Sequence, residues 1–400
     1  MTATPETFDA AHANGAAPPE ADTTLQWGLT PEQEAIRALA REVAEREFRD
    51  RALEWERTGE FPWRNLKVLA ETGLLGAAIP EEYGGAGGSW LDAALILEQI
   101  GRCCYVTAMA ALGELGVQTR AIVSYGSDEQ KRKYLPKVAA GDLMLAICMT
   151  EPETGSDISN MSTVARDDGD FLVIDGEKAL ISRGDVAGLF VVWVKFVDDP
   201  GPRNIGAILV ERDTPGFAVT QTYPTLGGES LFGLEFRGAR VPRENVLVRE
   251  DGFRKMLTAF NGQRCLNAAI CVGIAQGSQD AAVAYAKQRK QFGRPISEYQ
   301  GIQWMLADNE LQIEGARLLV WRAAARAGSR FPSRTEAAIA KITANEMALR
   351  VTDRSMQIFG GHGFLKEMPP ERFLRWARYG SLGGGTPQIL RNAIGRHLVG

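Results

Sequence analysis

Apolar residues recur every three to four positions through the first third of the chain, which is the spacing of one buried helix face. The first such helix opens with Thr30 as its N-cap, Pro31 at the first helical position and Gln33 where a capping box needs it. A glycine-rich break at 82–88 separates this helix from later ones. The pattern predicts a helical N-terminal domain at 25–145.

Between 146 and 248 the pattern changes to short β-branched and aromatic runs separated by Gly, Asp and Pro, which is typical of strands joined by turns. Leu189–Val194 is apolar throughout and predicts a buried strand. Phe171–Ile174 is followed by Asp175 and Gly176, a pair that favours a hairpin turn. We expect a compact antiparallel β domain here.

Helical spacing returns from 249 to 400, which predicts a C-terminal helical domain. A β domain between two helical ones indicates a cleft where the three meet, and clefts between domains are favoured ligand sites. Residues 1–24 are rich in Ala, Pro, Thr and Glu, with no basic start followed by an apolar stretch. They predict a disordered tail rather than a secretory signal.

Composition narrows the classes of partner. The formal net charge is -5, so the chain has no global field that attracts nucleic acid or an anionic membrane. No run of about 18 apolar residues is present, so no membrane span is expected. The five cysteines form no CxxC pair and the three histidines are scattered, which indicates reduced thiols, a cytoplasmic protein and no metal site.

Two segments have compositions suited to a flavin nucleotide. Met149–Asp157 carries the hydroxyls of Thr150 and Ser156 just after a predicted strand, where they can bond a flavin ring edge or a phosphate. Arg289–Pro295 places cations and the aromatic Phe292 around a glycine, which suits a pyrophosphate and an adenine. Taken alone, the first is equally a surface turn and the second a basic helix end.

Two glycine-rich segments follow nearer the C-terminus. Gln357–Phe364 has three glycines in four positions, which let a backbone approach a ligand or simply form a loop. Gly383–Gly385 precedes Thr386 and Pro387, an N-cap and a first helical position. Free amides ahead of a helix N-terminus bind anions or carbonyl oxygens.

The order and spacing of these segments resemble the acyl-CoA dehydrogenase superfamily over about 29–400. The matching signatures are Pro80–Gly85, Thr150-Glu151-Pro152, Gln291–Pro295, Gly360-Gly361 and Gly385-Thr386. The resemblance implies a mainly α fold with a central antiparallel β domain and a C-terminal four-helix bundle. It also implies noncovalent FAD, a homotetramer of two dimers, a substrate thioester of coenzyme A or of an acyl carrier protein, and an electron-transfer flavoprotein as candidate electron acceptor.

The resemblance further implies roles for single residues. Thr150 and Ser182 contact the flavin ring, Ser156 lies near the cofactor or thioester, and Arg264 lies near the active site. The residues implied for the rest of FAD are Arg289, Phe292, Gln357, Gly360 and Gly361, which bind its adenosine and pyrophosphate half across a subunit interface, and Thr386 and Gln388, which bind it at the start of the last helix.

The chain departs from this family at the catalytic base. In the family a carboxylate removes the proton α to the thioester carbonyl, a hydride leaves the β-carbon for the flavin, and an oxyanion hole binds the carbonyl. Most members have a glutamate where this chain has Gly384, and a minority have it where this chain has Gln263. Neither residue accepts a proton at neutral pH, although Gly384 still offers its backbone amide.

Two positions beside the predicted flavin contact also depart from the family pattern. A tryptophan is replaced by Leu180 and an asparagine by Arg183. A cation at Arg183 favours an anionic ligand or an anionic reduced flavin. The alternative is a side chain that points to solvent.

Three functions remain open at this point. The first is α,β-dehydrogenation with a base from elsewhere, for which Glu98, Glu229 and Glu235 are candidates by residue type. The second is base-independent chemistry on a thioester. The third is a flavoprotein that binds an acyl thioester without oxidising it.

The second function has a precedent in the same superfamily. A subgroup that eliminates sulfite from a sulfinylated propionyl thioester also lacks the glutamate, and it resembles this chain around Asn261–Arg264 and Gly384–Arg391. Its substrate-binding arginine falls near Met109, so the same substrate is not implied.

Overall fold

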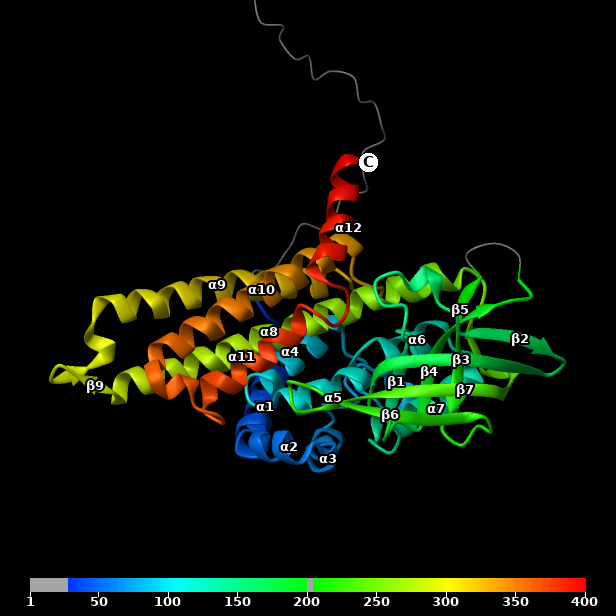
Figure 1. Ribbon diagram of the computed structural model, residues 1–400, viewed down its shortest axis with the longest axis horizontal. Coiled ribbons are helices and arrows are strands. Elements are labelled where there is room, and N and C mark those ends of the chain that lie inside the picture. The colour runs from blue at the N-terminus through cyan, green and yellow to red at the C-terminus, as the bar shows by residue number, and fades with distance from the viewer. Residues whose placement is uncertain (1–27, 200–203) are drawn as a thin grey trace, which may run out of the picture.

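The computed structural model describes residues 28–199 and 204–400, and the predicted tail at 1–24 lies outside them. Helices come first, strands second and helices last along the chain (Figure 1). The predicted fold class, mainly α with a central β domain, is confirmed. No helix in the described part of the chain is long and apolar enough to cross a membrane.

The N-terminal helices begin with the predicted cap. Thr30 accepts a hydrogen bond from the Gln33 amide while the Gln33 side chain accepts one from the Thr30 amide, which is the reciprocal pattern of a capping box. The helices are α1 (Pro31–Val43), α2 (Ala52–Thr58), α3 (Trp63–Glu71), α4 (Trp90–Gly101), α5 (Tyr105–Leu115), α6 (Val117–Tyr125) and α7 (Asp128–Ala139), with short turns η1 (Ala44–Phe48) and η2 (Glu81–Tyr83).

The middle of the chain forms an eight-stranded sheet in the order β6-β7-β3-β2-β4-β5-β8, with β1 paired to β4. Its strands are β1 (Leu145–Cys148), β2 (Val164–Asp168), β3 (Phe171–Ser182), β4 (Leu189–Phe196), β5 (Ile205–Glu211), β6 (Phe217–Pro224), β7 (Ser230–Pro242) and β8 (Val246–Val248). β4 is buried as predicted. The sheet is mixed rather than purely antiparallel, because β1 and β2 both pair with β4 in parallel.

The hairpin predicted at Asp175 and Gly176 is wrong, because β3 runs straight through both residues. The turn that joins β2 to β3 comes earlier, where Asp168 pairs with Phe171. Gly176 instead marks a register shift between β3 and β7. A Cβ there would lie 2.6 Å from the Cα of Thr163, so the glycine permits a close backbone approach at an irregularity in the strand.

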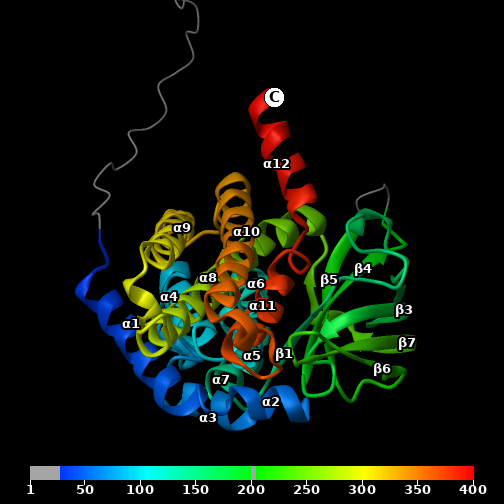
Figure 2. The same ribbon diagram turned by 60° about the vertical axis from the view of Figure 1, so that its left-hand side comes forward.

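The C-terminal part is dominated by α8, which runs from the sheet to the β9–β10 hairpin (Figure 1). Its elements are α8 (Gly252–Gln288), β9 (Lys290–Gln291), β10 (Arg294–Pro295), α9 (Gln300–Ala325), α10 (Arg334–Phe359), α11 (Pro369–Gly380) and α12 (Pro387–Val399). The last helix, α12, projects away from the body of the chain (Figures 1 and 2). From this element order we infer the three domains at 25–145, 146–248 and 249–400.

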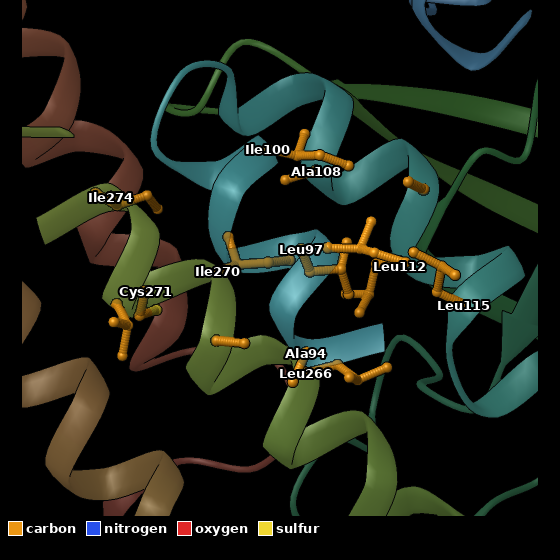
Figure 3. Close-up of a cluster of buried hydrophobic side chains, with 14 of the residues drawn as sticks. Ala94, Leu97, Ile100, Ala108, Leu112, Leu115, Leu266, Ile270, Cys271 and Ile274 are labelled. Atoms are coloured by element: carbon orange, nitrogen blue, oxygen red, sulfur yellow. The ribbon is translucent and has the colours of Figure 1, made fainter. Parts of the chain in front are cut away.

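The largest core lies where α4 and α5 pack against α8 (Figure 3). Leu97 and Leu112 meet Ile270 there, and all three are buried. The backbones of α4 and α8 come close because both have a glycine at the crossing. A Cβ on Gly273 would lie 2.1 Å from the Glu98 carbonyl oxygen, and one on Gly101 would lie 2.8 Å from the Ile270 carbonyl oxygen.

Because of this close crossing, we expect two glycine-to-alanine substitutions to change the free energy of unfolding in opposite directions. Gly273→Ala forces α4 and α8 apart, so we expect a loss of about 1–3 kcal/mol in the free energy of unfolding. The matched control is Gly315→Ala in α9, where a Cβ meets nothing within 4 Å; it should gain up to about 1 kcal/mol. The midpoint of thermal unfolding measures both, and equal midpoints would contradict the close crossing.

Candidate functional site

The Thr150 segment is held by a buried ion pair. Lys178 Nζ lies 2.8 Å from Glu151 Oε1, and both side chains are essentially inaccessible to solvent. Glu151 also accepts hydrogen bonds from the amide of Thr163 and the hydroxyl of Ser162. Burial opposes the charge on Glu151, but Lys178 and these donors outweigh it and lower the pKa of Glu151 to about 2.

The same ion pair brings the two predicted flavin contacts together. The Thr150 carbonyl accepts a hydrogen bond from the Ala179 amide at 2.9 Å, so Thr150 lies beside the end of β3 that carries Ser182. Both residues are half-buried, whereas Ser156 is exposed in the following loop. The structure therefore places the Thr150 backbone against the part of β3 that ends at Ser182, and it leaves Ser156 in an exposed loop.

The backbone next to Ser182 is strained. Leu180 and Arg183 have φ values of 56° and 64°, a left-handed conformation that costs a non-glycine residue of the order of 1–3 kcal/mol. The pairing of β3 with β7 is irregular between Lys178 and Ile181. Leu180 is 52% exposed, an apolar side chain presented beside two hydroxyl groups. That combination suits the face and edge of a flavin ring.

Arg183 does not point to solvent, so that alternative is wrong. Its Nη1 lies 2.9 Å from Glu114 Oε2 and 3.2 Å from the Ala110 carbonyl oxygen, and its guanidinium packs over Gly113, where a Cβ would lie 1.7 Å from Nη1. Burial raises the pKa of Glu114, and the neighbouring guanidinium opposes that rise. The predicted cation is therefore present near Ser182 but paired with a carboxylate.

The glycine run before α12 forms a loop that side chains of α8 and α10 hold in place. Gly384 and Gly385 have φ values of 74° and 98°, and Thr386 caps α12 as predicted by accepting a hydrogen bond from the Ile389 amide. Gln388 is exposed on the first turn. Arg264 Nε donates to the Gly384 carbonyl at 3.3 Å, so the structure brings together these two predicted residues from α8 and the loop.

Lys341 is a second support of this loop, and sequence reasoning missed it. It is fully buried on α10, and its Nζ donates to the carbonyl oxygens of Gly380 at 2.7 Å and Gly385 at 3.1 Å. Asn345 donates to Gly380 as well. The signal that could have found it is a lysine inside the alanine-rich run at 337–344.

Gln263 directly precedes Arg264 in α8, but its side chain contacts the start of α6 rather than the loop of Gly384. Its Oε1 accepts a hydrogen bond from the Val117 amide at 3.3 Å, at the start of α6. A Cβ on Gly116 would lie 2.6 Å from the same oxygen, so the side chain fills a gap between α5 and α6. The two positions expected to carry the base, Gly384 and Gln263, thus flank the residue Arg264.

The residues predicted for the adenosine half lie at the other end of α8. Arg289 and the hairpin residue Phe292 follow its C-terminus, and Phe292 is 95% exposed. Gln357, Gly360 and Gly361 close α10 at the same end. The rings of Tyr285 and Phe359 stack with centroids 4.0 Å apart, which joins the ends of α8 and α10. About 25 residues of helix, roughly 38 Å, separate Arg264 from Arg289.

A pocket opens beside Ser182. It lies between α5, the loop at 59–62, the residues that follow β3 and the loop before β7, and its volume is about 40 Å³, enough for a few water molecules. Glu229 lines it and accepts a hydrogen bond from the Tyr105 hydroxyl at 2.6 Å. Its Oε2 has no hydrogen-bond partner among the described residues. Burial raises the pKa of Glu229.

Aromatic rings connect this pocket to the glycine loop. Tyr105 packs edge-on against Tyr379, and the Tyr379 ring occupies the space where a Cβ on Gly383 would lie. Glu229 therefore lies within two side chains of the loop that carries Gly384. Tyr105 and Tyr379 were not predicted, because only the fold brings α5 and α11 together.

The other two candidate carboxylates lie elsewhere. Glu98 is bonded to the guanidinium of Arg317 at 2.9 Å and to the indole nitrogen of Trp321 within the helical core. Glu235 lies on β7, where it accepts a hydrogen bond from Arg237 at 2.6 Å. Neither residue lines the pocket beside Ser182.

The described ranges 28–199 and 204–400 contain no cluster of side chains suited to hold a metal ion. No group of three or more His, Cys, Asp or Glu side chains converges there. All five cysteines are buried and free.

Lys341 predicts a pH dependence of stability. Burial lowers its pKa from 10.5 to about 8, so between these values the unfolded chain binds more protons than the folded one. Raising the pH from 8 toward 10.5 therefore increases the free energy of unfolding, by at most about 1.4 kcal/mol per pH unit.

The Lys341→Met variant should lose this increase, as measured by urea unfolding at several pH values. The matched control is Lys67→Met, which removes an exposed lysine of α3 and should keep the increase. If Lys341→Met and wild type differ by the same amount at every pH, Lys341 does not titrate in this range.

Comparison with known proteins covers nearly the whole chain. Three family models match, described as the N-terminal domain of acyl-CoA dehydrogenase at 30–142, the middle domain at 146–239 and the C-terminal domain at 250–399. Among curated relatives, a 3-sulfinopropanoyl-CoA desulfinase of Paraburkholderia xenovorans is 41% identical, with 93% of this chain and 97% of the relative aligned. A probable acyl-CoA dehydrogenase of Bacillus subtilis is 38% identical, over 94% of this chain and 100% of the relative.

Solved structures agree with these matches. Butyryl-CoA dehydrogenase from Megasphaera elsdenii superposes with a TM-score of 0.90 at 32% identity, covering 94% of this chain and 100% of that one. A glutaryl-CoA dehydrogenase from Mycobacterium smegmatis in complex with FADH2 gives a TM-score of 0.86 at 25% identity, with 92% and 95% covered. The three matched domains, the glycine loop and these relatives show that the chain belongs to the acyl-CoA dehydrogenase family.

Proposed function

We propose that this chain is an FAD-dependent oxidoreductase that removes hydrogen from the α and β carbons of an acyl thioester, with Glu229 as the proton acceptor. The observation that carries the proposal is the position of Glu229. It lines the same pocket as Ser182, and Tyr105 and Tyr379 connect it to the loop of Gly384. Its raised pKa makes it a stronger base at neutral pH than an ordinary glutamate.

The residues present fit FAD. Thr150 and Ser182 offer hydroxyl groups near the end of β3, the exposed side chain of Leu180 offers apolar contact, and the loop of Gly384 presents backbone amides at the start of α12. When bound, FAD supplies the acceptor for the β-hydride. The residues of this chain then bind the thioester near the loop of Gly384, and Glu229 takes the α-proton.

We further propose that FAD is shared between two copies of the chain. Figure 1 shows the β domain that carries Ser182 at one end of α8 and the β9–β10 hairpin at the other, so Ser182 and Arg289 are too far apart for one nucleotide to reach both within one chain. The exposed ring of Phe292 suits burial against a second copy. This arrangement supports association of at least two copies of the chain. In keeping with the family, we also propose a homotetramer, a thioester of coenzyme A or of an acyl carrier protein as substrate, and an electron-transfer flavoprotein as electron acceptor.

A desulfinase-like reaction is the second candidate. It is favoured by the absence of a carboxylate at both Gly384 and Gln263 and by the name of the 41% identical relative. The two functions differ in product. A desulfinase releases sulfite from a 3-sulfinopropanoyl thioester, whereas a dehydrogenase bleaches the flavin with a saturated acyl thioester under anaerobic conditions.

Replacing the proposed base tests its role. Glu229→Gln should slow anaerobic flavin bleaching by about 10²- to 10⁴-fold, the usual contribution of a general base, with FAD content unchanged. Glu235→Gln is the matched control and should bleach like wild type. Undiminished bleaching in Glu229→Gln would place the base elsewhere, and no bleaching of the wild type by any acyl thioester would exclude dehydrogenation.

A second variant tests whether the base can be moved. Gln263→Glu keeps an oxygen for the Val117 amide, and a helix N-terminus favours a negative charge there. That hydrogen bond stabilises the carboxylate and weakens it as a base. In the Glu229→Gln background, Gln263→Glu should therefore restore bleaching by only about tenfold.

The corresponding change at Gly384 is the comparison for this rescue. A glutamate there must adopt a φ near 74° and place its Cβ 3.1 Å from Lys341 Cε. Gly384→Glu should therefore restore less activity than Gln263→Glu. The reverse order would show that the glycine loop adapts freely.

A further inference from the structure

The charges around the pocket beside Ser182 do not favour an anion. Three of the lining residues, Glu60, Asp185 and Glu229, are acidic. Arg183 is the one basic residue in the lining. Glu60 and Asp185 are exposed at the rim, while Glu229 is held against Tyr105. An acyl group with a terminal carboxylate or sulfinate would meet these side chains at close range.

Arg183 offers such a group no uncompensated charge, because it is paired with Glu114, although its buried Nε has no hydrogen-bond partner in the described part of the chain. Nη1 contacts both carboxylate oxygens of Glu114, at 3.0 and 2.9 Å, and the Glu114 side chain is fully buried. Glu114 is itself fixed, since it accepts a hydrogen bond from the Leu145 amide at 3.0 Å. Together Arg183 and Glu114 are neutral. Even with Glu229 and Asp185 protonated, the wall therefore offers no uncompensated positive charge to an anion that leaves water.

Apart from the hydroxyl groups of Ser182 and Ser230, the remaining wall is mainly apolar. Val106, Met109 and Ala110 of α5 contribute one side, and Phe232 contributes another. A volume of about 40 Å³ leaves room for a short group only.

We propose that the pocket selects a short, uncharged acyl group and rejects acyl groups with an anionic end, and that the Arg183–Glu114 ion pair sets this preference. The proposal rests on the proposed action on an acyl thioester and specifies its substrate class. Glu114 acts as a positioning residue, because it holds the guanidinium and neutralises it without touching the substrate.

The test compares butyryl-CoA with succinyl-CoA, which differ by a terminal carboxylate and both have hydrogens at the α and β carbons. The second-order rate constant of anaerobic flavin bleaching should be at least about 100-fold higher for butyryl-CoA. Met109→Arg adds a cation to the wall and should lower this ratio by about tenfold or more. Met109→Gln adds polarity without charge and should leave the ratio unchanged.

Glu114→Gln is an independent variant if Met109→Arg does not fold. It keeps an oxygen for the Leu145 amide and releases the charge of Arg183, so the ratio should again fall by about tenfold or more. Equal rates for the two thioesters in the wild type, or an unchanged ratio in both charge variants, would overturn the proposal. Bleaching by neither thioester would instead contradict the proposed dehydrogenation, so the two failures are distinguishable.

Discussion

Two buried ion pairs hold the segment from which the candidate site is built. Lys178 at its start is paired with Glu151, and Arg183 at its end is paired with Glu114. Between them the backbone departs from regular strand pairing, and Leu180 adopts a left-handed conformation. A strained segment persists only where its surroundings hold it at both ends. The first pair ties the segment to the Thr150 loop and the second ties the β domain to α5, so the same contacts that join the domains also shape the surface between them.

The sequence predicts the local features of this fold well, because their causes are local. The cap at Thr30, the cap at Thr386 and the buried strand β4 each depend on residues close together in the chain. The Asp175-Gly176 turn was wrong for the opposite reason. The need for a glycine there comes from Thr163 on a neighbouring segment, and nothing in a short window of sequence reveals that neighbour.

The candidate site shows the same division. Resemblance points to the loop at Gly384 and to the hydroxyl of Ser182, but not to the groups that orient them. The partner of Arg183 is 69 residues away, and the lysine that supports the glycine loop, Lys341, belongs to another helix. Of three glutamates equal by residue type, only Glu229 lines the pocket, because the loop before β7 folds against α5. Burial and pairing decide between like residues, and both are properties of the tertiary structure.

The left-handed backbone at Gly384 also bears on how such a chain can change over generations. A single substitution to glutamate would meet both an unfavourable φ and the side chain of Lys341, so it would first reduce stability. A glutamate at that position would therefore need a compensating change nearby to keep the loop stable. A carboxylate on a different loop meets no such barrier. Glycine at position 384 therefore makes this loop resistant to gaining a carboxylate, whereas the position of Glu229, which has no positive φ, holds one without this strain.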